Sequence, residues 1–215
     1  YTFTLRVYDD LGTASCVDAE LVVEVKPDEV IHVEVLWTNP EGPEPDPASE
    51  VGSDLDLHFM HPFAQLNKPD YDEDGEPDGW FDALHDCFWY NREPNWDVKT
   101  TDDDDPGLDL DDKDGAGPEN INLRTPPSGA EYRVGVHYWK AHGFGPATAT
   151  VRVYLLGELV YETTLEGLKE GDLWEVCNIT FDPETGEGTV SAISNAEGLP
   201  KVFANYPIPP QLPND

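Results

Sequence analysis

Proline and glycine interrupt this chain too often for long helices to form. The 215 residues include 20 prolines and 18 glycines, and a proline inside a helix removes a hydrogen bond and clashes with the preceding turn. Between these breaks, apolar and polar residues alternate, as in 132–139, 148–156 and 173–181. That alternation is typical of half-buried strands. We therefore predict an all-β fold, an immunoglobulin-like or jelly-roll-type β-sandwich.

The sequence divides into three predicted parts. Residues 1–27 alternate as two strands around a turn at 9–12, and they form a terminal β-hairpin. Residues 28–195 contain the other alternating segments and form the sandwich. Residues 196–215 are rich in proline and form an extended tail, either a linker or a strap. Because the chain opens on a strand without an initiator Met, we expect it to be the product of a longer precursor.

Residues 61–107 lack periodicity and form one long insertion within the sandwich. A loop of this length normally needs a ligand, a metal or a disulfide to hold it. A disulfide between Cys87 and Cys177 is one possibility, with Cys16 left to pair elsewhere. Three buried free thiols are the equal alternative. We predict that calcium stabilises the insertion.

The formal net charge of −33 limits the possible partners. The 45 acidic side chains face only 12 basic ones, so the clustered Lys and Arg that bind nucleic acid are absent. The chain also lacks the run of about 18 apolar residues that inserts into a membrane. Divalent cations would neutralise the acidic surface, and adaptation to high salt is the alternative explanation.

The first acidic motif lies inside the insertion and has the spacing D-x-D-x-D-G. Alternate carboxylates in a loop that bends at glycine can surround one calcium ion with oxygen atoms. The motif resembles the loops of thrombospondin type 3 repeats and, more loosely, an EF-hand. Phe81 stands where the EF-hand has its bidentate Glu, so that carboxylate would come from another residue such as Asp82. The predicted ligands are Asp70, Asp72, Asp74, Glu76 and Asp78.

The second acidic motif joins a strand to a distant acidic run. On strands, Asp54 and Asp56 share one face, and Asp109 and Asp111 share another. Two adjacent strands would bring these four carboxylates together, and a cation between them would relieve their repulsion. Acidic residues farther along the run would complete the site. The predicted ligands are Asp54, Asp56, Asp109, Asp111, Asp112, Asp114 and Glu119.

A zinc site and a catalytic site are the alternatives to calcium binding. His58 and His137, on neighbouring predicted strands near Asp56, would offer zinc a mixed nitrogen and oxygen site. The chain has no G-x-S-x-G elbow, no H-E-x-x-H motif and no glycine-rich phosphate loop. We therefore expect no catalytic residues and no enzymatic activity.

Aromatic residues gather in the insertion. If exposed, they would form a platform on which a sugar or a peptide stacks. If buried, they would form the insertion's own small core, which is the alternative we favour. The candidate ligand-binding residues are Trp80, Trp89, Tyr90 and Trp96.

Three segments carry a resemblance to a known family. SDLDLHFMHP, LDLDDKDGAGPENINL and PPSGAEYRVGVHYW together resemble the YfaP-like domain over about residues 29–182. The first 25 residues are similar to the last hairpin of a polycystic-kidney-disease-type immunoglobulin-like domain. The resemblance implies a calcium-stabilised bacterial surface domain, of the kind appended to adhesive or peptidase-linked proteins.

These observations predict a calcium-binding structural or adhesive module that is secreted or held at the bacterial cell surface. One alternative is a carbohydrate- or peptide-binding module that uses the aromatic insertion to hold a surface glycan or protein. The other is a self-assembling subunit of an extracellular polymer, joined through the N-terminal hairpin or the C-terminal tail.

Overall fold

The computed structural model describes residues 2–22, 29–40, 42, 52–64, 78–96, 104–113, 115, 117–127, 129–210 and 212. In these ranges the chain forms β-strands and no α-helix. No described helix is long and apolar enough to cross a membrane. The predicted all-β class is confirmed.

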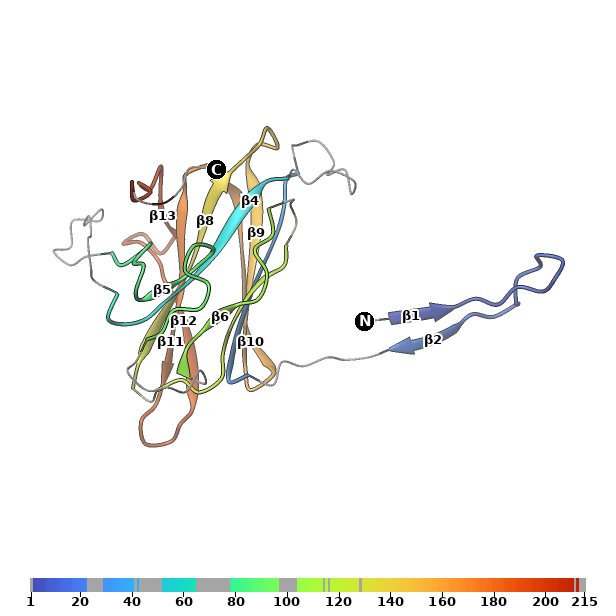
Figure 1. The fold of residues 1–215 in the computed structure, drawn as a ribbon, viewed down its shortest axis with the longest axis horizontal. Coiled ribbons are helices and arrows are strands. Elements are labelled where there is room, and N and C mark those ends of the chain that lie inside the picture. Colours follow the sequence, from blue (N-terminus) through green and yellow to red (C-terminus); the bar gives the residue numbers. More distant parts are fainter. Residues whose placement is uncertain are drawn as a thin grey trace.

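Two antiparallel sheets face each other as a β-sandwich (Figure 1). The first sheet has the strand order β10-β9-β3-β7-β6, and the second has the order β12-β11-β8-β4-β5, with β13 added beside β11. The first sheet consists of β3 (Ile31–Thr38), β6 (Gly107–Leu108), β7 (Glu119–Leu123), β9 (Ala147–Leu155) and β10 (Glu158–Leu168). The second consists of β4 (Asp54–Met60), β5 (Asp86–Cys87), β8 (Glu131–Lys140), β11 (Leu173–Phe181), β12 (Gly188–Ala192) and β13 (Lys201–Phe203).

The main core lies between the sheets. Alternate residues of β3 and β9 are buried, as the period of two predicts for strands with one solvent-facing side. Strand β4 differs because all seven of its residues are buried. Its odd-numbered residues, Leu55, Leu57 and Phe59, belong to the main core. Its even-numbered residues lie on the outer face of the second sheet and need a different cover.

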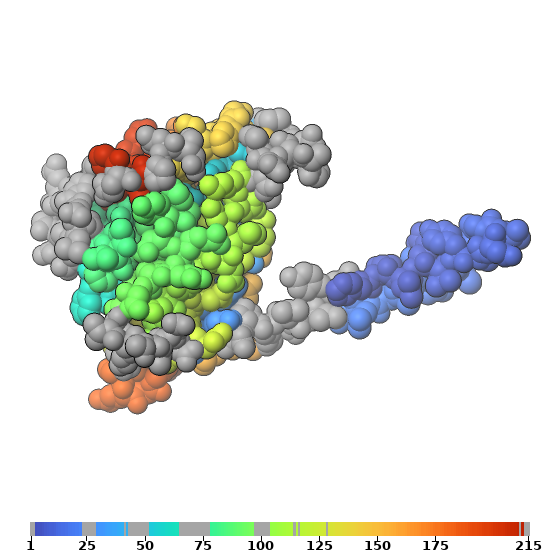
Figure 2. All heavy atoms as spheres, in the orientation of Figure 1, coloured from blue at the N-terminus to red at the C-terminus, as the bar shows by residue number. Residues whose placement is uncertain are grey.

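The insertion supplies that cover. Its described part is not fully irregular, because β5 pairs with Phe59 and Met60 of β4 and β6 pairs with β7. The insertion and the tail form a second apolar cluster over the second sheet. Figure 2 shows residues 78–96 and 104–113 side by side on the face of the molecule turned to the viewer. The second cluster contains Met60, Ala64, Trp80, Phe81, Phe88, Trp139, Leu173, Tyr206 and Leu212.

The buried carboxylate of Glu175 in β11 contacts three parts of the chain. Its Oε1 accepts hydrogen bonds from Trp80 Nε1 at 2.9 Å and from Arg133 at 3.2 Å. Its Oε2 lies 2.8 Å from Lys201 Nζ. The insertion, β8 and the tail therefore meet at this side chain. The tail packs as a strap, with β13 completing the second sheet.

The N-terminal residues form a separate antiparallel pair, β1 (Thr2–Leu5) and β2 (Ala19–Val22). In Figure 1 this hairpin lies apart from both sheets of the sandwich. Phe3 pairs with Leu21 across one face, and both side chains are more than half exposed. The hairpin therefore presents an apolar face that nothing in the described chain covers.

The three cysteines are free thiols. Cys87 and Cys177 are buried in the main core, while Cys16 is exposed on the hairpin. Burial raises the pKa of the Cys177 thiol to about 12. The insertion is therefore held by packing and not by a disulfide between Cys87 and Cys177.

Gly135 provides a test of the second cluster. A Cβ at this position would lie 2.7 Å from the Trp80 ring, so Gly135→Ala must displace the indole from Glu175. We expect the free energy of unfolding, measured by urea titration, to fall by about 1–3 kcal/mol. Gly107→Ala is the matched control, because a Cβ there meets nothing within 4 Å. Equal stability of the two variants would contradict this packing.

Candidate metal centre

Three carboxylates converge at one end of β4. One carboxylate oxygen from each of Asp54, Asp56 and Asp111 lies within 4.8 Å of the other two. Asp54 and Asp56 share the outer face of β4 because they are two residues apart on a strand. Asp111 approaches from the segment that follows β6. The period-two pattern of SDLDL thus places two ligands, and a distant loop supplies the third.

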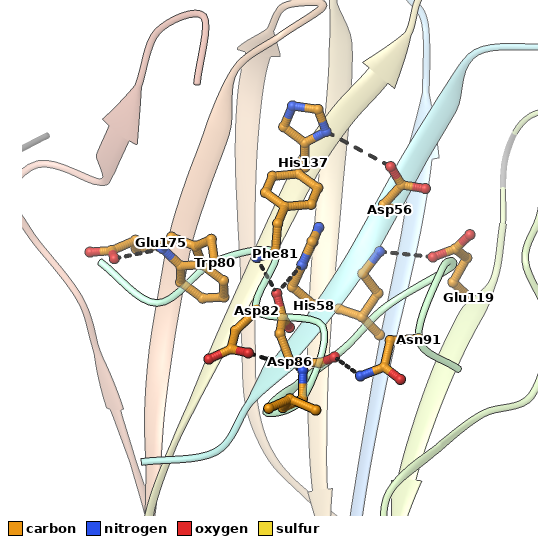
Figure 3. A network of polar contacts seen from close by, with 12 residues as sticks. Asp56, His58, Trp80, Phe81, Asp82, Asp86, Asn91, Glu119, His137 and Glu175 are labelled. Atoms are coloured by element: carbon orange, nitrogen blue, oxygen red, sulfur yellow. Dashed lines mark hydrogen bonds and ion pairs between the residues drawn. The ribbon is translucent and has the colours of Figure 1, made fainter. Parts of the chain in front are cut away.

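Glu119 adds a fourth carboxylate from the opposite sheet. It begins β7 and is fully buried. Its Oε2 accepts the backbone N–H of Leu57 at 2.8 Å, and its Oε1 accepts the N–H of Asp112 at 3.1 Å. Strand β5 pairs only with Phe59 and Met60, so it leaves this part of the β4 edge unpaired. Glu119 therefore ties β4, the 109–113 segment and the first sheet together (Figure 3).

The acidic cluster is electrostatically unfavourable without a cation. Burial, with the nearby charges of Asp56 and Asp111, raises the pKa of Asp54 to about 8. Burial, followed by the charge of Asp56, raises the pKa of Glu119 well above its usual range. Carboxyl groups held close together in a poorly hydrated site retain their protons to higher pH, unless a bound cation displaces those protons. A bound divalent ion would let these groups ionise.

Two of the carboxylates also have vacant acceptor positions. Asp54 is 6% exposed, and its Oδ1 is buried without a hydrogen-bond donor among the residues that the structure describes. Asp111 Oδ1 is in the same state. A buried acceptor without a partner costs about 1–3 kcal/mol. Oxygen atoms left open in this way are what a hard cation such as calcium requires.

Two buried histidines adjoin the cluster but do not enter it. His137 Nδ1 lies 3.8 Å from Asp56 Oδ2, and burial lowers the pKa of His137 to about 3, so this ring is neutral. His58 Nδ1 lies 2.7 Å from Asp86 Oδ2, which also accepts the N–H of Phe81 (Figure 3). Within the described chain, no histidine belongs to a group of three converging ligand atoms. The geometry therefore favours an oxygen-only site over the zinc site.

The structure separates Asp109 from the other predicted ligands. Strand β6 ends at Leu108, so residues 109–111 do not alternate as strand residues, and the prediction that they do is wrong. Asp109 is exposed and accepts a hydrogen bond from Asn122 at 2.6 Å. Asp112 accepts the N–H of Gly115 at 3.2 Å and so shapes the loop. Asp114 lies outside the described residues.

Most of the D-x-D-x-D-G motif also lies outside the described residues. This applies to Asp70, Asp72, Asp74 and Glu76, so calcium binding by this loop stays a prediction. Asp78 is buried, and its carbonyl accepts a hydrogen bond from Arg133 at 3.2 Å. Asp82, the substitute for the missing EF-hand Glu, accepts the N–H of Leu84 and faces His85 at 3.5 Å.

The aromatic residues of the insertion mostly face inward. Trp80 is buried and bonded to Glu175, so its assignment as an exposed stacking residue is wrong. Trp89 and Trp96 are partly buried against the main core. Tyr90 is the half-exposed member of the set. Trp80 packs in a cluster that the insertion shares with the second sheet and the tail, and not in a core of the insertion alone.

Lys113 is the residue at this site that sequence reasoning missed. Its ammonium lies 3.8 Å from Asp111 Oδ2 and 5.6 Å from the centroid of the Trp89 ring. The signal that would have revealed it is its position as the single basic residue in the acidic run 108–121.

Comparisons with known proteins give no functional assignment. No protein-family model matches the chain, and no curated protein matches it. A solved structure described as "unknown function protein SAV2460" is similar at 18% sequence identity and a TM-score of 0.47. The match covers 84% of this chain and 92% of that one. A likeness at this level carries no argument about function, so the function must be argued from the site.

The raised pKa of Asp54 predicts how stability depends on pH when metal is removed. Folded Asp54 keeps its proton up to about pH 8, whereas the unfolded side chain loses it near pH 4. The free energy of unfolding in EDTA should therefore fall as pH rises through this window. Asp54→Asn should remove this contribution and raise stability at pH 8 by at least about 1 kcal/mol.

Urea unfolding in EDTA at pH 5 and pH 8 measures this effect. Asp109→Asn is the matched control because that carboxylate is exposed. An unchanged difference between the two pH values in Asp54→Asn would show that Asp54 ionises normally.

Proposed function

We propose that this chain binds calcium through Asp54, Asp56, Asp111 and Glu119 and serves as a non-catalytic structural or adhesive module outside the cell. The observation that carries the proposal is the convergence of three carboxylates within 4.8 Å. One of them, Asp54, is more than nine-tenths buried and has an acceptor without a donor in the described chain. Calcium takes six to eight oxygen ligands, so backbone carbonyls and water would complete the shell.

The bound ion would act as a cross-link. Asp54 and Asp56 belong to the second sheet, Asp111 belongs to the loop after β6, and Glu119 belongs to the first sheet. An ion among them would replace the repulsion of four carboxylates with attraction to one centre. It would also fix the loop beside the insertion. Calcium sites of extracellular modules typically have dissociation constants of about 10⁻⁴–10⁻³ M, which suits such a structural role.

The location outside the cell is supported by charge and by family resemblance. A net charge of −33 favours a protein that works with divalent cations at high concentration. The three segments that resemble the YfaP-like domain include Asp54, Asp56, Asp111 and Glu119. We therefore propose secretion or display at the cell surface as the setting of this module.

One observation favours a second candidate function, which is assembly through the N-terminal hairpin. Phe3, Leu5 and Leu21 lie on one face of β1–β2, and all three are more than half exposed. An amphipathic ribbon of two strands gains stability when its apolar face meets another sheet. Sedimentation of the intact protein as a monomer at high concentration would count against this candidate.

Calcium loading tests the principal proposal. We expect millimolar calcium to raise the free energy of unfolding by about 1–2 kcal/mol over the EDTA-treated protein, as mass action predicts for a millimolar site at several-fold excess of ligand. Asp56→Asn and Asp111→Asn should each lower the calcium stoichiometry, measured by native mass spectrometry, by one ion. Counting ions separates this site from any calcium bound by residues 70–78.

Asp109→Asn is the control, because it removes a neighbouring exposed carboxylate of the same run. The proposal fails if Asp56→Asn and Asp111→Asn bind as many calcium ions as the wild type.

A further inference from the structure

A lysine of the protein itself lies beside the acidic cluster. Lys113 follows Asp111 by two residues, and its Nζ lies 3.8 Å from Asp111 Oδ2. Its side chain is about half exposed, whereas that of Asp111 is largely buried. Lys113 thus stands between the buried carboxylates and solvent, on the side where Asp111 is partly accessible.

Lys113 also lies close to the other carboxylates of the cluster. Its Nζ is 3.8 Å from Asp111, and Asp111 contributes an oxygen that lies within 4.8 Å of those of Asp54 and Asp56. An ammonium at this position offsets part of the negative charge, as a bound metal ion would. The cluster therefore has a partial counter-ion before any metal enters.

In the same position the ammonium also lies over an aromatic ring. Nζ is 5.6 Å from the centroid of the Trp89 ring, within the range at which a cation is attracted to the face of an indole. Trp89 is itself held by Trp139, whose ring centroid lies 5.1 Å away. A lysine that moves away from Asp111 therefore has the Trp89 ring beside it.

We propose that Lys113 is a tethered ammonium that competes with the metal ion for the acidic cluster and moves away from Asp111, beside the Trp89 ring, when the ion binds. This inference rests on the proposed calcium site and adds a residue that sets its affinity. An ammonium 3.8 Å from Asp111 Oδ2 weakens the binding of a divalent ion through the open Oδ1 of the same carboxylate, because the two cations repel each other. Movement of the half-exposed side chain opens no cavity in the core.

For this competition to occur, the acidic cluster must attract a metal ion even while Lys113 lies beside it. Asp54 is deeply buried with an acceptor that no described residue satisfies. This oxygen is more deeply buried than the half-exposed lysine and remains without a partner while the ammonium lies beside Asp111. The ammonium is therefore a weak substitute for a metal ion that reaches all the carboxylates.

Replacement of the lysine tests the inference. Lys113→Met keeps much of the apolar stem and removes the charge, so we expect it to bind calcium about two- to fivefold more tightly, as for loss of a half-exposed charge pair. Isothermal titration calorimetry on the full chain measures the affinity, and a melting curve in EDTA checks folding. The ratio of affinities should shrink toward one in high salt, which screens the ammonium.

Two variants serve as controls. Lys113→Arg keeps the positive charge and should leave the affinity near that of the wild type. Lys169→Met removes the same charge from the turn between β10 and β11, and its affinity should also be unchanged.

The outcomes separate this inference from the calcium site itself. If the wild type binds calcium and Lys113→Met binds it equally or more weakly, the competition is refuted and Lys113 instead positions Asp111. If only Lys113→Met binds calcium, the lysine fills the site in the wild type, and the competition is upheld. If neither protein binds calcium, the calcium site fails and the inference falls with it.

Discussion

Strand β4 runs through the molecule with both of its faces buried, and this constraint shapes everything around it. Its apolar residues face the first sheet, as in any sandwich. Its polar residues face outward, where Asp54, Asp56 and His58 would normally be solvated. The insertion and the tail instead cover them, so each buried polar atom needs a partner from the protein or from a ligand. Asp86 meets this need for Nδ1 of His58, whereas His58 Nε2 and Asp54 Oδ1 have no hydrogen-bond partner among the described residues.

Glu119 shows how the two sheets depend on the same group of carboxylates. It satisfies an unpaired N–H on the edge of β4 and at the same time contributes negative charge beside Asp56. The hydrogen bonds favour an ionised Glu119, while burial and the neighbouring charges oppose ionisation. A divalent ion would resolve this conflict, because it stabilises the charged form that makes the better acceptor. Sheet pairing and metal binding would then reinforce each other.

The sequence correctly predicts the strands and strand faces that depend on local periodicity. The strands around 132–139, 148–156 and 173–181 follow from alternation, and so does the pairing of Asp54 with Asp56 on one face. Asp109 was misplaced because strand β6 ends one residue earlier, and nothing in LDLDD marks that end. The sequence favours burial of the insertion's aromatic residues, but it does not identify the partners of Trp80, because these are the bare backbone of Gly135 and the carboxylate of Glu175 in two distant strands.

The position of Glu175 has a consequence for where the folding unit ends. Trp80 from the insertion and Lys201 from the tail share this one carboxylate, and Tyr206 and Leu212 pack in the same apolar cluster as Trp80. A fragment that stops at residue 195 would keep the strands of both sheets except β13. It would nevertheless lack Tyr206 and Leu212, which pack in the apolar cluster with the insertion. It would also lack Lys201, which forms an ion pair with Glu175. The smallest autonomous sandwich therefore extends to Leu212, and the tail is part of the fold.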